Sequence, residues 1–494
     1  MPGLHRPEFL PRLLCLALAA SLTACAVGPD YQRPAPPEGA VAPSYREGGN
    51  WKAATPSSVD PTQPWWTAFG DPRLDALVAE ANAANQDIRV AEAQYREAQA
   101  LVQNAQAAWY PTVGVNVAGS RARSRSAPGP TTLGNGHAWS LNAAWEPDLW
   151  GRVRRAVEGA SDTAQASEAD LAAAHLTVQA AVVNDYIQLR VADAQQKLYE
   201  RTLEAYRKSL QITQSQYRAG IVTRGDVALA NTTLQDAQAQ AIDTDLTRRQ
   251  LEHAIAVLLG KTPSQFSLPP DALALRLPQV PVGVPSELLE RRPDIAGAER
   301  RAASANAGIG LAQSAYYPTL ALTASGGFSG AGLVSWAAAP DKVWALGAAV
   351  AGTLFDGGQR SAQVAQARAA FDASAAQYRK TVLAGFQEVE DNLAALDLLA
   401  REREAQDQAV TSARDAERVS LSQYRAGTTT YLSVVTAQAL ALTNERSSLE
   451  LQGRQFAASV ALVKAVGGGW NADQLQTRDA ASPQATDKTA SAGK

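Results

Sequence analysis

The chain has 494 residues, of which 19% are charged, and its formal net charge is −3. That balance supplies no basic surface for nucleic acid, so a nucleic-acid partner is excluded. Past the N-terminus there is no apolar stretch of about 18 residues, which excludes a membrane-spanning helix. Membrane-spanning β-strands remain open, because their alternating pattern scores poorly on hydropathy.

The N-terminus carries an export signal. Basic residues precede the apolar run at 13–20, and the sequence LTAC follows at 22–25. This order is typical of a secretory signal peptide, here 1–24. Cys25 resembles the lipidated cysteine of a bacterial lipobox, which implies a covalent diacylglycerol and palmitoyl anchor; an ordinary signal with an incidental cysteine is the alternative. Ala26, by resemblance to lipoprotein sorting, favours the outer membrane. One acyl anchor binds a membrane only marginally, so further membrane contact is expected downstream.

The hexapeptide SQYRAG occurs twice, at 215–220 and 422–427, which are 207 residues apart. The same offset aligns the Tyr-Pro-Thr sequence at 110–112 with that at 317–319, and the Leu-Gly and Val-Gly pairs ending at Gly260 and Gly467. Three landmarks in one register predict a tandem duplication. We place the repeats at 73–260 and 293–467. The flanking segments are 25–72, 261–292 and a polar tail at 468–494.

The first repeat has a helical pattern. Residues 73–108 lack Pro and Gly and predict one incoming helix. Residues 152–219 predict a helix about 100 Å long, too long for a globular domain. The returning helix is predicted at 225–259, and with the incoming helix it matches the long one in length, so the two short helices are expected to stack end to end beside it. The second repeat predicts 359–426 and 432–466 in the same roles. Apolar and small residues at steps of three and four predict a coiled-coil seam on the long helix: Leu189, Ala192, Gln196, Tyr199, Leu203, Tyr206, Leu210, Thr213 and Tyr217.

Each SQYRAG copy predicts the far tip of a helical hairpin. Gly220 and Gly427 are suited to end a helix, because glycine readily takes the left-handed conformation. Thr223 followed by Asp226 resembles a capping box in which Asp replaces the usual Glu or Gln. Thr430 is the counterpart of Thr223 in the second repeat. Capping and seam packing alone are the alternative to a functional role for any one of these residues.

Between the incoming and long helices of each repeat lies an alternating hairpin, at 110–150 and 317–357. Val113, Val115 and Val117 alternate with small and polar residues, as do their counterparts in the other segments. Strands of about ten residues have the length that crosses a bilayer when tilted. A soluble β-sandwich is the alternative. Four tryptophans near the predicted strand ends fit aromatic girdles at a lipid interface: Trp109, Trp139, Trp145 and Trp344.

Four strands per chain are too few to close a barrel. Two chains would supply eight strands and a filled interior, whereas three would supply twelve around a lumen. The predicted fold class is therefore an α+β membrane protein. A homotrimer would form a 12-stranded β-barrel in lipid, continuous with a tube of six helical hairpins.

Several motifs together resemble one family. They are CAVGPDY at 25–31, WEPDLWGRVR at 145–154, LLERRPDI at 288–295, LFDGGQR at 354–360 and both YRAG tips. The chain resembles TolC-type outer-membrane efflux channels, or outer membrane factors, in their lipoprotein branch. The resemblance implies a trimeric 12-stranded outer-membrane β-barrel, continuous with a long periplasmic α-helical coiled-coil barrel that has an equatorial domain around its middle. It also implies two partners in a Gram-negative bacterium: a periplasmic adaptor, and an inner-membrane transporter of the resistance–nodulation–division class.

By the same resemblance, Tyr424 corresponds to a constricting tyrosine at the closed periplasmic entrance, and Tyr217 is its counterpart. Asp226 matches a carboxylate that pairs with an arginine in a relative, but the matching region here reads Thr428-Thr429-Thr430. Ser433 and Thr436 stand where that relative has an aspartate ring. The entrance is therefore expected to close by other contacts. Residues assigned to the tip and to adaptor docking are Tyr217, Gly220, Thr223, Asp226, Tyr424, Gly427, Thr430 and Ser433.

No catalytic motif emerges. The four histidines lack metal-ligand spacing, no nucleophile motif occurs, and the acidic run at 388–391 is interpreted as a solvated helix face. We expect no metal, no cofactor beyond the lipid anchor, and no enzymatic activity. Three functions remain: an exit duct for small toxic compounds or drugs in a multidrug-resistance efflux pump, a type I protein-secretion duct, and a lipid-anchored coiled-coil scaffold without a pore. The transported substrate, and which pump and adaptor serve the chain, are not written in the sequence.

Overall fold

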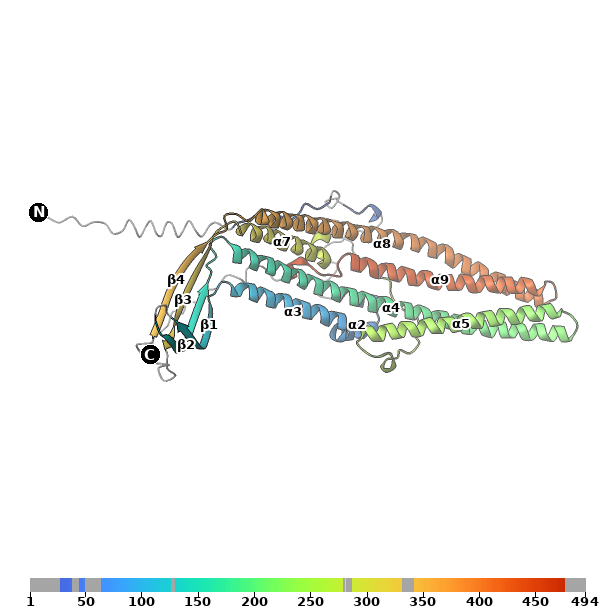
Figure 1. Ribbon diagram of the computed structural model, residues 1–494. Helices are drawn as coiled ribbons and strands as arrows, with labels where there is room; N and C mark the ends of the chain where they lie inside the picture. The colour runs from blue at the N-terminus through green and yellow to red at the C-terminus, as the bar shows by residue number, and fades with distance from the viewer. Residues whose placement is uncertain are drawn as a thin grey trace, which may run out of the picture.

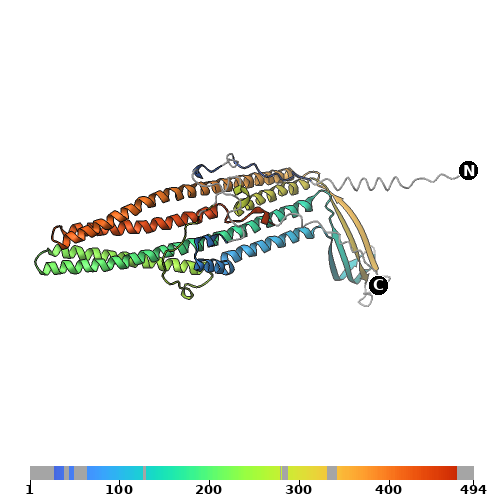
Figure 2. The same cartoon turned by 180° about the vertical axis from the view of Figure 1, so that it is seen from behind.

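The computed structural model describes residues 27–37, 44–48, 64–125, 129–278, 280, 287–330 and 342–475. A long bundle of helices carries a four-stranded sheet at one end, and two helical hairpins form the other end (Figures 1 and 2). The predicted signal peptide, Cys25 and most of the C-terminal tail lie outside the described residues. Within the described ranges, no helix combines the length and the apolar content needed to cross a membrane.

The first repeat contains α2 (Pro72–Ala84), α3 (Gln86–Ala107), α4 (Arg152–Arg218) and α5 (Arg224–Leu258). The predicted long helix and returning helix are confirmed, and the 67 residues of α4 span about 100 Å. The single incoming helix predicted at 73–108 is wrong, because the chain breaks at Asn85 into two helices.

The break at Asn85 has a clear chemical cause. Its side-chain oxygen accepts the backbone N–H groups of Asp87 (2.9 Å) and Ile88 (3.2 Å), which begins α3 with an N-cap. Its side-chain amide donates to the carbonyl of Leu258 (2.9 Å), at the end of α5. The junction of α2 and α3 therefore meets the end of α5, and α2, α3 and α5 all pack against α4. The predicted end-to-end stacking therefore holds for α3 and α5 but not for the whole incoming segment, because α2 packs beside the end of α5.

The second repeat contains the short α6 (Leu288–Arg291), then α7 (Pro293–Ser314), α8 (Gln359–Arg425) and α9 (Tyr431–Ala465). Here Arg292 joins the ends of two helices: its guanidinium donates to the carbonyl of Ala465 (3.1 Å) and to the Glu388 carboxylate (2.7 Å). Glu390 accepts the backbone N–H groups of Arg46 and Glu47. The run at 388–391 lies on a largely solvent-exposed face, as interpreted, but these two glutamates also accept hydrogen bonds from other segments.

Two of the sequence motifs start the long helices. Asp148, in WEPDLWGRVR, accepts the backbone N–H groups of Val153 (3.0 Å) and Arg154 (2.9 Å) at the start of α4. Asp356, in LFDGGQR, accepts the backbone N–H groups of Gly358 (2.9 Å) and Arg360 (3.2 Å) at the start of α8. Each carboxylate satisfies donors that have no partner within the helix and lies at the positive end of the helix dipole. These motifs therefore fix the direction in which each long helix leaves the sheet.

The sheet contains β1 (Thr112–Arg125), β2 (Thr131–Trp145), β3 (Thr319–Gly330) and β4 (Lys342–Ala351), all antiparallel in the order β1-β2-β3-β4. Pairing of β2 with β3 joins the hairpins of the two repeats. The first hairpin is longer than the ten-residue strands expected and extends beyond the second. Among the described residues, β1 and β4 each keep one edge without a strand partner.

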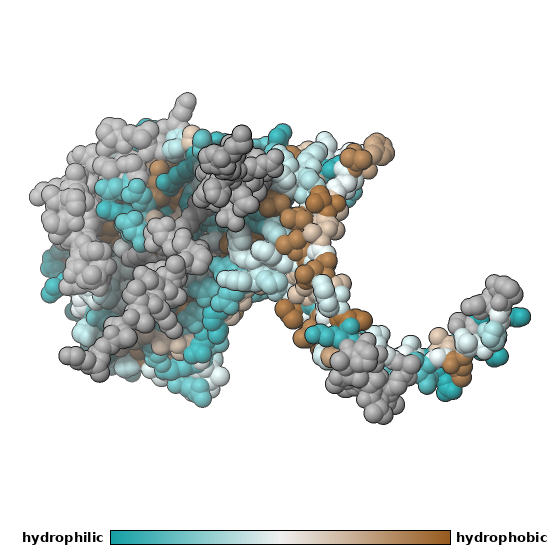
Figure 3. Space-filling model, turned by 90° about the vertical axis from the view of Figure 1, so that its left-hand side faces the viewer, coloured by the Kyte–Doolittle hydropathy of each residue, from teal (hydrophilic) through white to brown (hydrophobic). Residues whose placement is uncertain are grey.

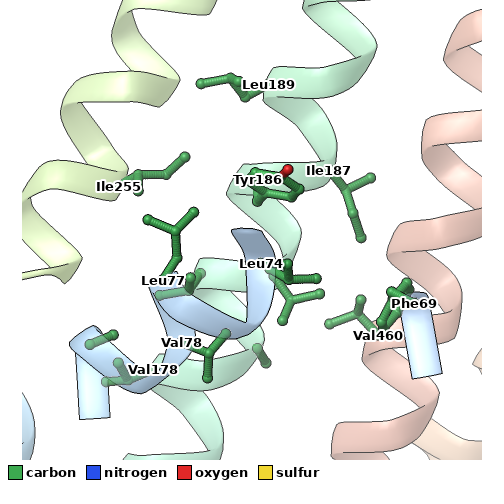
Figure 4. Close-up of a cluster of buried hydrophobic side chains, with 14 of the residues drawn as sticks. Phe69, Leu74, Leu77, Val78, Val178, Tyr186, Ile187, Leu189, Ile255 and Val460 are labelled. Atoms are coloured by element: carbon green, nitrogen blue, oxygen red, sulfur yellow. The ribbon is translucent and has the colours of Figure 1, made fainter. Parts of the chain in front are cut away.

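The largest apolar core lies around the middle of the bundle (Figure 4). Leu74 and Val78 of α2 pack with Tyr186 of α4, Ile255 of α5 and Val460 of α9. The short 3-10 helix Trp65–Phe69 closes this core, and half-buried leucines of 266–275 pack against it. Segments from both flanks of the first repeat thus cover the middle of the bundle, where the equatorial domain was expected.

A buried charge network fastens the 268–271 segment to the helices. The guanidinium of Arg190 donates to Asp193 (2.7 Å) and to the carbonyl of Pro269 (3.0 Å). Arg248 of α5 donates to the other oxygen of Asp193 (2.7 Å) and to the carbonyl of Leu268. Both arginines donate to carbonyls of an irregular segment, and these bonds hold the segment against α4 and α5.

The N-terminal segment 27–37 runs along α4, α7 and α8. Arg155, 5% exposed, donates to the carbonyl of Val27 (3.2 Å), the carbonyl of Gly28 (3.3 Å) and the carboxylate of Asp30 (3.1 Å). Gly28 has φ +108°, and a Cβ there would meet the Cα of Gly310 in α7 at 2.4 Å. Only glycine fits this close approach, which explains its place in CAVGPDY.

Candidate functional site

The two hairpin tips end their long helices identically. Gly220 (φ +75°) and Gly427 (φ +77°) are left-handed, and a Cβ at either would meet no atom within 4 Å. In the first tip the N–H of Gly220 donates to the carbonyl three residues back, and that of Ile221 to the carbonyl five residues back, each at 2.9 Å. Gly427 and Thr428 repeat both bonds at 3.0 Å. This is the Schellman pattern, which satisfies carbonyls at the helix end.

The tips differ where the returning helix begins. Thr223 Oγ1 accepts the N–H of Asp226 (3.2 Å), and the Asp226 carboxylate accepts the N–H of Thr223 (2.9 Å), so the predicted capping box is confirmed. In the second tip Ser433 takes the place of Asp226. Thr430 makes no side-chain capping bond there, and the two hydroxyl oxygens lie 3.4 Å apart.

The two SQYRAG tyrosines lie in different surroundings. Tyr217 is 46% exposed, whereas Tyr424 is 3% exposed. The hydroxyl of Tyr424 donates to Thr213 Oγ1 on α4 (3.2 Å), and its ring lies 5.2 Å from that of Tyr431. Burial raises the pKa of Tyr424, so the phenol stays neutral. Within one chain, Tyr424 therefore holds the second hairpin against the first, and Tyr217 faces solvent.

Tyr424 belongs to a tip cluster that joins the hairpins: Ala230, Tyr424, Tyr431 and Val434, with half-buried apolar residues around them. The sequence analysis did not identify Tyr431 and Val434. Tyr431 aligns with Arg224 in the repeat register, so this departure from the duplication was the available signal. An aromatic residue at a position where the other repeat has a charge marks the side of the tip that packs inward.

On the side of the tip cluster nearer the sheet, a polar contact links the two hairpins. Gln438 of α9, 1% exposed, donates to Ser209 Oγ of α4 (3.2 Å). Within the second hairpin, Arg414 of α8 pairs with Glu445 of α9 at 2.6 Å. Burial, and then the charge of Glu445, raises the pKa of Glu417. A groove of about 800 Å³ continues from here toward the 270–273 segment and is lined by residues of both hairpins.

The sheet presents one continuous apolar face. Val113, Val115 and Val117 lie opposite Ala143, Leu141 and Trp139 in register, and the pairing continues through β3 to Leu346 and Val350. These valines are 64–70% exposed, and Leu346 is 75% exposed. The other face carries small and polar residues. Figure 3 shows the sheet as a curved arm that stands clear of the helical body, with apolar residues along it. So large an exposed apolar face marks a surface that is covered in the working protein.

The four tryptophans occupy two levels of the sheet. Trp109 and Trp145 lie where the sheet meets the helices, joined by a bond from Trp145 Nε1 to the Trp109 carbonyl (3.1 Å). Trp344 lies near the other end of β4. The placement of Trp139 near the end of its own strand is wrong, because β2 continues well beyond it. Trp139 is stacked on Phe328 (5.3 Å), level with the first residue of β4.

The fold and these surfaces define a class of protein. Two helices about 100 Å long form hairpins that pack together at their tips. They carry an open sheet whose apolar face needs lipid. This is the protomer of an outer-membrane channel with a long helical extension. No cluster of three or more His, Cys, Asp or Glu among the described residues is placed to hold a metal ion.

Comparison with known proteins identifies the family. The family model for outer membrane efflux proteins matches residues 77–261 and 284–468, more than half of the chain. The two matched segments begin 207 residues apart, the offset between the SQYRAG copies. The chain belongs to this family, and the resemblance and internal duplication seen in the sequence are confirmed. It is an outer-membrane protein whose helices extend into the periplasm.

Curated relatives match along nearly their whole length. The toluene efflux pump outer membrane protein TtgC of Pseudomonas putida is 31% identical over 477 residues, which cover 95% of this chain and 98% of that protein. The pyoverdine export outer membrane protein OpmQ of Pseudomonas putida is 33% identical over 477 residues, covering 94% and 99%.

Solved structures agree with the fold. The outer-membrane channel OprN superposes with a TM-score of 0.81 at 29% identity, covering 90% of this chain and all of that one. The open state of the MtrE outer membrane channel of Neisseria gonorrhoeae gives 0.79 at 28% identity, covering 92% and 100%.

Proposed function

We propose that three copies of this chain form the outer-membrane exit duct of a tripartite efflux pump. The observation that carries the proposal is the four-stranded sheet, with an exposed apolar face and unpaired edges at β1 and β4. Unpaired strand edges do not persist in lipid, so β1 of one chain pairs with β4 of the next until the barrel closes. Twelve strands with small residues on the inner face leave a lumen.

The helices continue the lumen into the periplasm. In the trimer, six hairpins surround a tube whose far end is formed by the tips. Tyr217, Gly220 and Gly427 are exposed there and form the docking surface for a periplasmic adaptor. Asp226 and Thr223 keep that surface rigid through the capping box, and the tip cluster at Tyr424 keeps the tips together. An inner-membrane transporter of the resistance–nodulation–division class supplies the cargo through the adaptor.

The cargo is small toxic molecules, in keeping with relatives that serve toluene efflux and pyoverdine export. The duct carries out no chemical step on this cargo. Specificity resides in the transporter, because a wide lumen lined by small side chains selects little.

The lipid anchor at Cys25 completes the attachment to the membrane. Val27, the first described residue, donates its N–H to the carbonyl of Trp150 (3.1 Å), in the turn between β2 and α4. This position is next to Trp145 and Trp109 at the helix-proximal end of the sheet. The geometry therefore supports an acylated Cys25, two residues earlier, at the level of the inner leaflet.

Two measurements separate this proposal from its alternatives. Conductance in planar bilayers distinguishes a duct from a scaffold without a pore, which would give no channels. Susceptibility of a deletion strain distinguishes an efflux duct from a type I secretion duct. We expect the strain to become more sensitive to solvents or small drugs while secreted proteins are unchanged. Loss of a secreted protein with unchanged drug sensitivity would reassign the duct to secretion.

A further inference from the structure

The outward face of β1 changes abruptly in character along its length. Val113, Val115 and Val117 occupy every second position on the apolar face, and after Gly119 the same column continues with three arginines. Their cross-strand neighbours on this face are uncharged. We call Arg121, Arg123 and Arg125 the arginine column.

The arginine column begins at the position along β1 where a membrane-spanning strand would leave the hydrocarbon. A transmembrane strand needs about 9–11 residues when tilted, and Arg121 is the tenth residue of β1. Trp139 and Phe328 lie on the same face, in register with Val117, two residues before Gly119. Lys342 of β4 is in register with them. The column begins where the hydrocarbon ends, on the side away from the helices.

Among the described residues, the arginine column has no carboxylate partner. The hairpin 112–145 contains no Asp or Glu. The side chains of Arg121, Arg123 and Arg125 are exposed, and among the described residues none of them has an ion-pair partner. Alternate residues of a strand lie about 7 Å apart on one face, so the three guanidinium groups form a ladder that rises along β1 from the edge of the hydrocarbon, with Arg121 nearest to it.

We propose that the arginine column binds the phosphate groups of lipids in the outer leaflet. Guanidinium groups bind phosphate oxygens through paired charge-assisted hydrogen bonds. Valines directly below the column pack against acyl chains of the same lipids, so apolar and charged contacts act on one molecule. This inference rests on the proposed function for its orientation, with the helices in the periplasm and the far end of β1 outside.

The test uses full-length lipidated protein in detergent and a fluorescent bisphosphorylated lipid A as the probe. The variant Arg121→Gln/Arg123→Gln/Arg125→Gln removes the column. The control variant Arg96→Gln/Arg207→Gln/Arg368→Gln removes the same charge from exposed helical positions. We expect the column variant to bind at least about tenfold more weakly, because each arginine near a charged membrane surface contributes roughly fivefold. The control variant should bind like the wild type.

Three further arms make the result decisive. Dephosphorylated lipid A should bind poorly to the wild type, and inorganic phosphate at equal phosphorus concentration should not displace the probe. Arg123→Gln alone provides a milder variant with a smaller, measurable loss. Equal binding by wild type and column variant would overturn the inference, as would displacement by inorganic phosphate. Conductance of the same preparations is recorded separately, so failure to form channels would reject the proposed duct while the lipid measurement still stands.

Discussion

Replacement of Tyr424 by Phe tests the contact that joins the two hairpins of one chain. The hydroxyl of Tyr424 donates to Thr213 Oγ1 across 3.2 Å, and both side chains are buried. Thr213 keeps its own bond to the carbonyl of Ser209 (3.0 Å), so the change leaves no buried donor unpaired. The ring and its packing against Tyr431 remain. The substitution therefore removes one hydrogen bond and little else.

The expected size of the effect follows from that single bond. A buried hydrogen bond of this kind contributes about 1 kcal/mol net. Its loss shifts the equilibrium between joined and separated tips about fivefold per chain. If the three chains of a trimer separate together, the shift exceeds about a hundredfold, because the three free-energy losses add.

Single-channel recording in planar bilayers measures this shift as the open probability. Tyr424→Phe should open more often than the wild type, with unchanged conductance of the open channel. The matched control is Tyr217→Phe, since Tyr217 has the same sequence context and is 46% exposed. An open probability equal to the wild type in Tyr424→Phe, or an equal rise in both variants, would refute the role given to the tip cluster.

Three other changes have defined outcomes. Gly220→Glu or Gly427→Glu should abolish drug export while the oligomer still assembles. Each side chain has open space, so the strain of a left-handed residue stays local to an exposed tip that lies on the docking surface. Normal drug resistance in both variants would count against docking there. Gly467→Ala should lower the melting temperature far more than Gly469→Ala: both have φ near +90°, but only at Gly467 would a Cβ meet a backbone oxygen, at 1.9 Å. Burial, and then a neighbouring carboxylate, raises the pKa of Glu417 above its ordinary value of 4.5, so folding favours its protonated form. Stability should rise as pH falls through that raised pKa and decline as pH increases, and thermal melting against pH should lose part of this slope in Glu417→Gln.

Local signals in the sequence were sufficient for the helix ends and the strand faces. The capping box at Thr223 and Asp226 depends only on residues three apart, so its spacing predicts it. The apolar faces of the strands follow from alternation, and the observed register brings those faces together. The duplication is equally a property of the sequence alone.

Long-range contacts decided what the sequence did not show. Asn85 caps α3 locally, and its amide also bonds to the carbonyl of Leu258; this second contact lies far away in the chain and is not visible in an alanine-rich run. Tyr217 and Tyr424 share a hexapeptide, yet only Tyr424 is buried, since Tyr431 and Thr213 surround it in space. The length of β1 beyond the membrane depends on its pairing with β2, not on alternation of apolar residues.

The central claim is that the exposed edges of β1 and β4 join between chains. The most direct measurement is the mass of the purified full-length protein in detergent, by native mass spectrometry, before and after heating. The account predicts three chains per complex before heating and single chains afterwards. A monomer before heating, in a detergent that preserves the sheet, would contradict it.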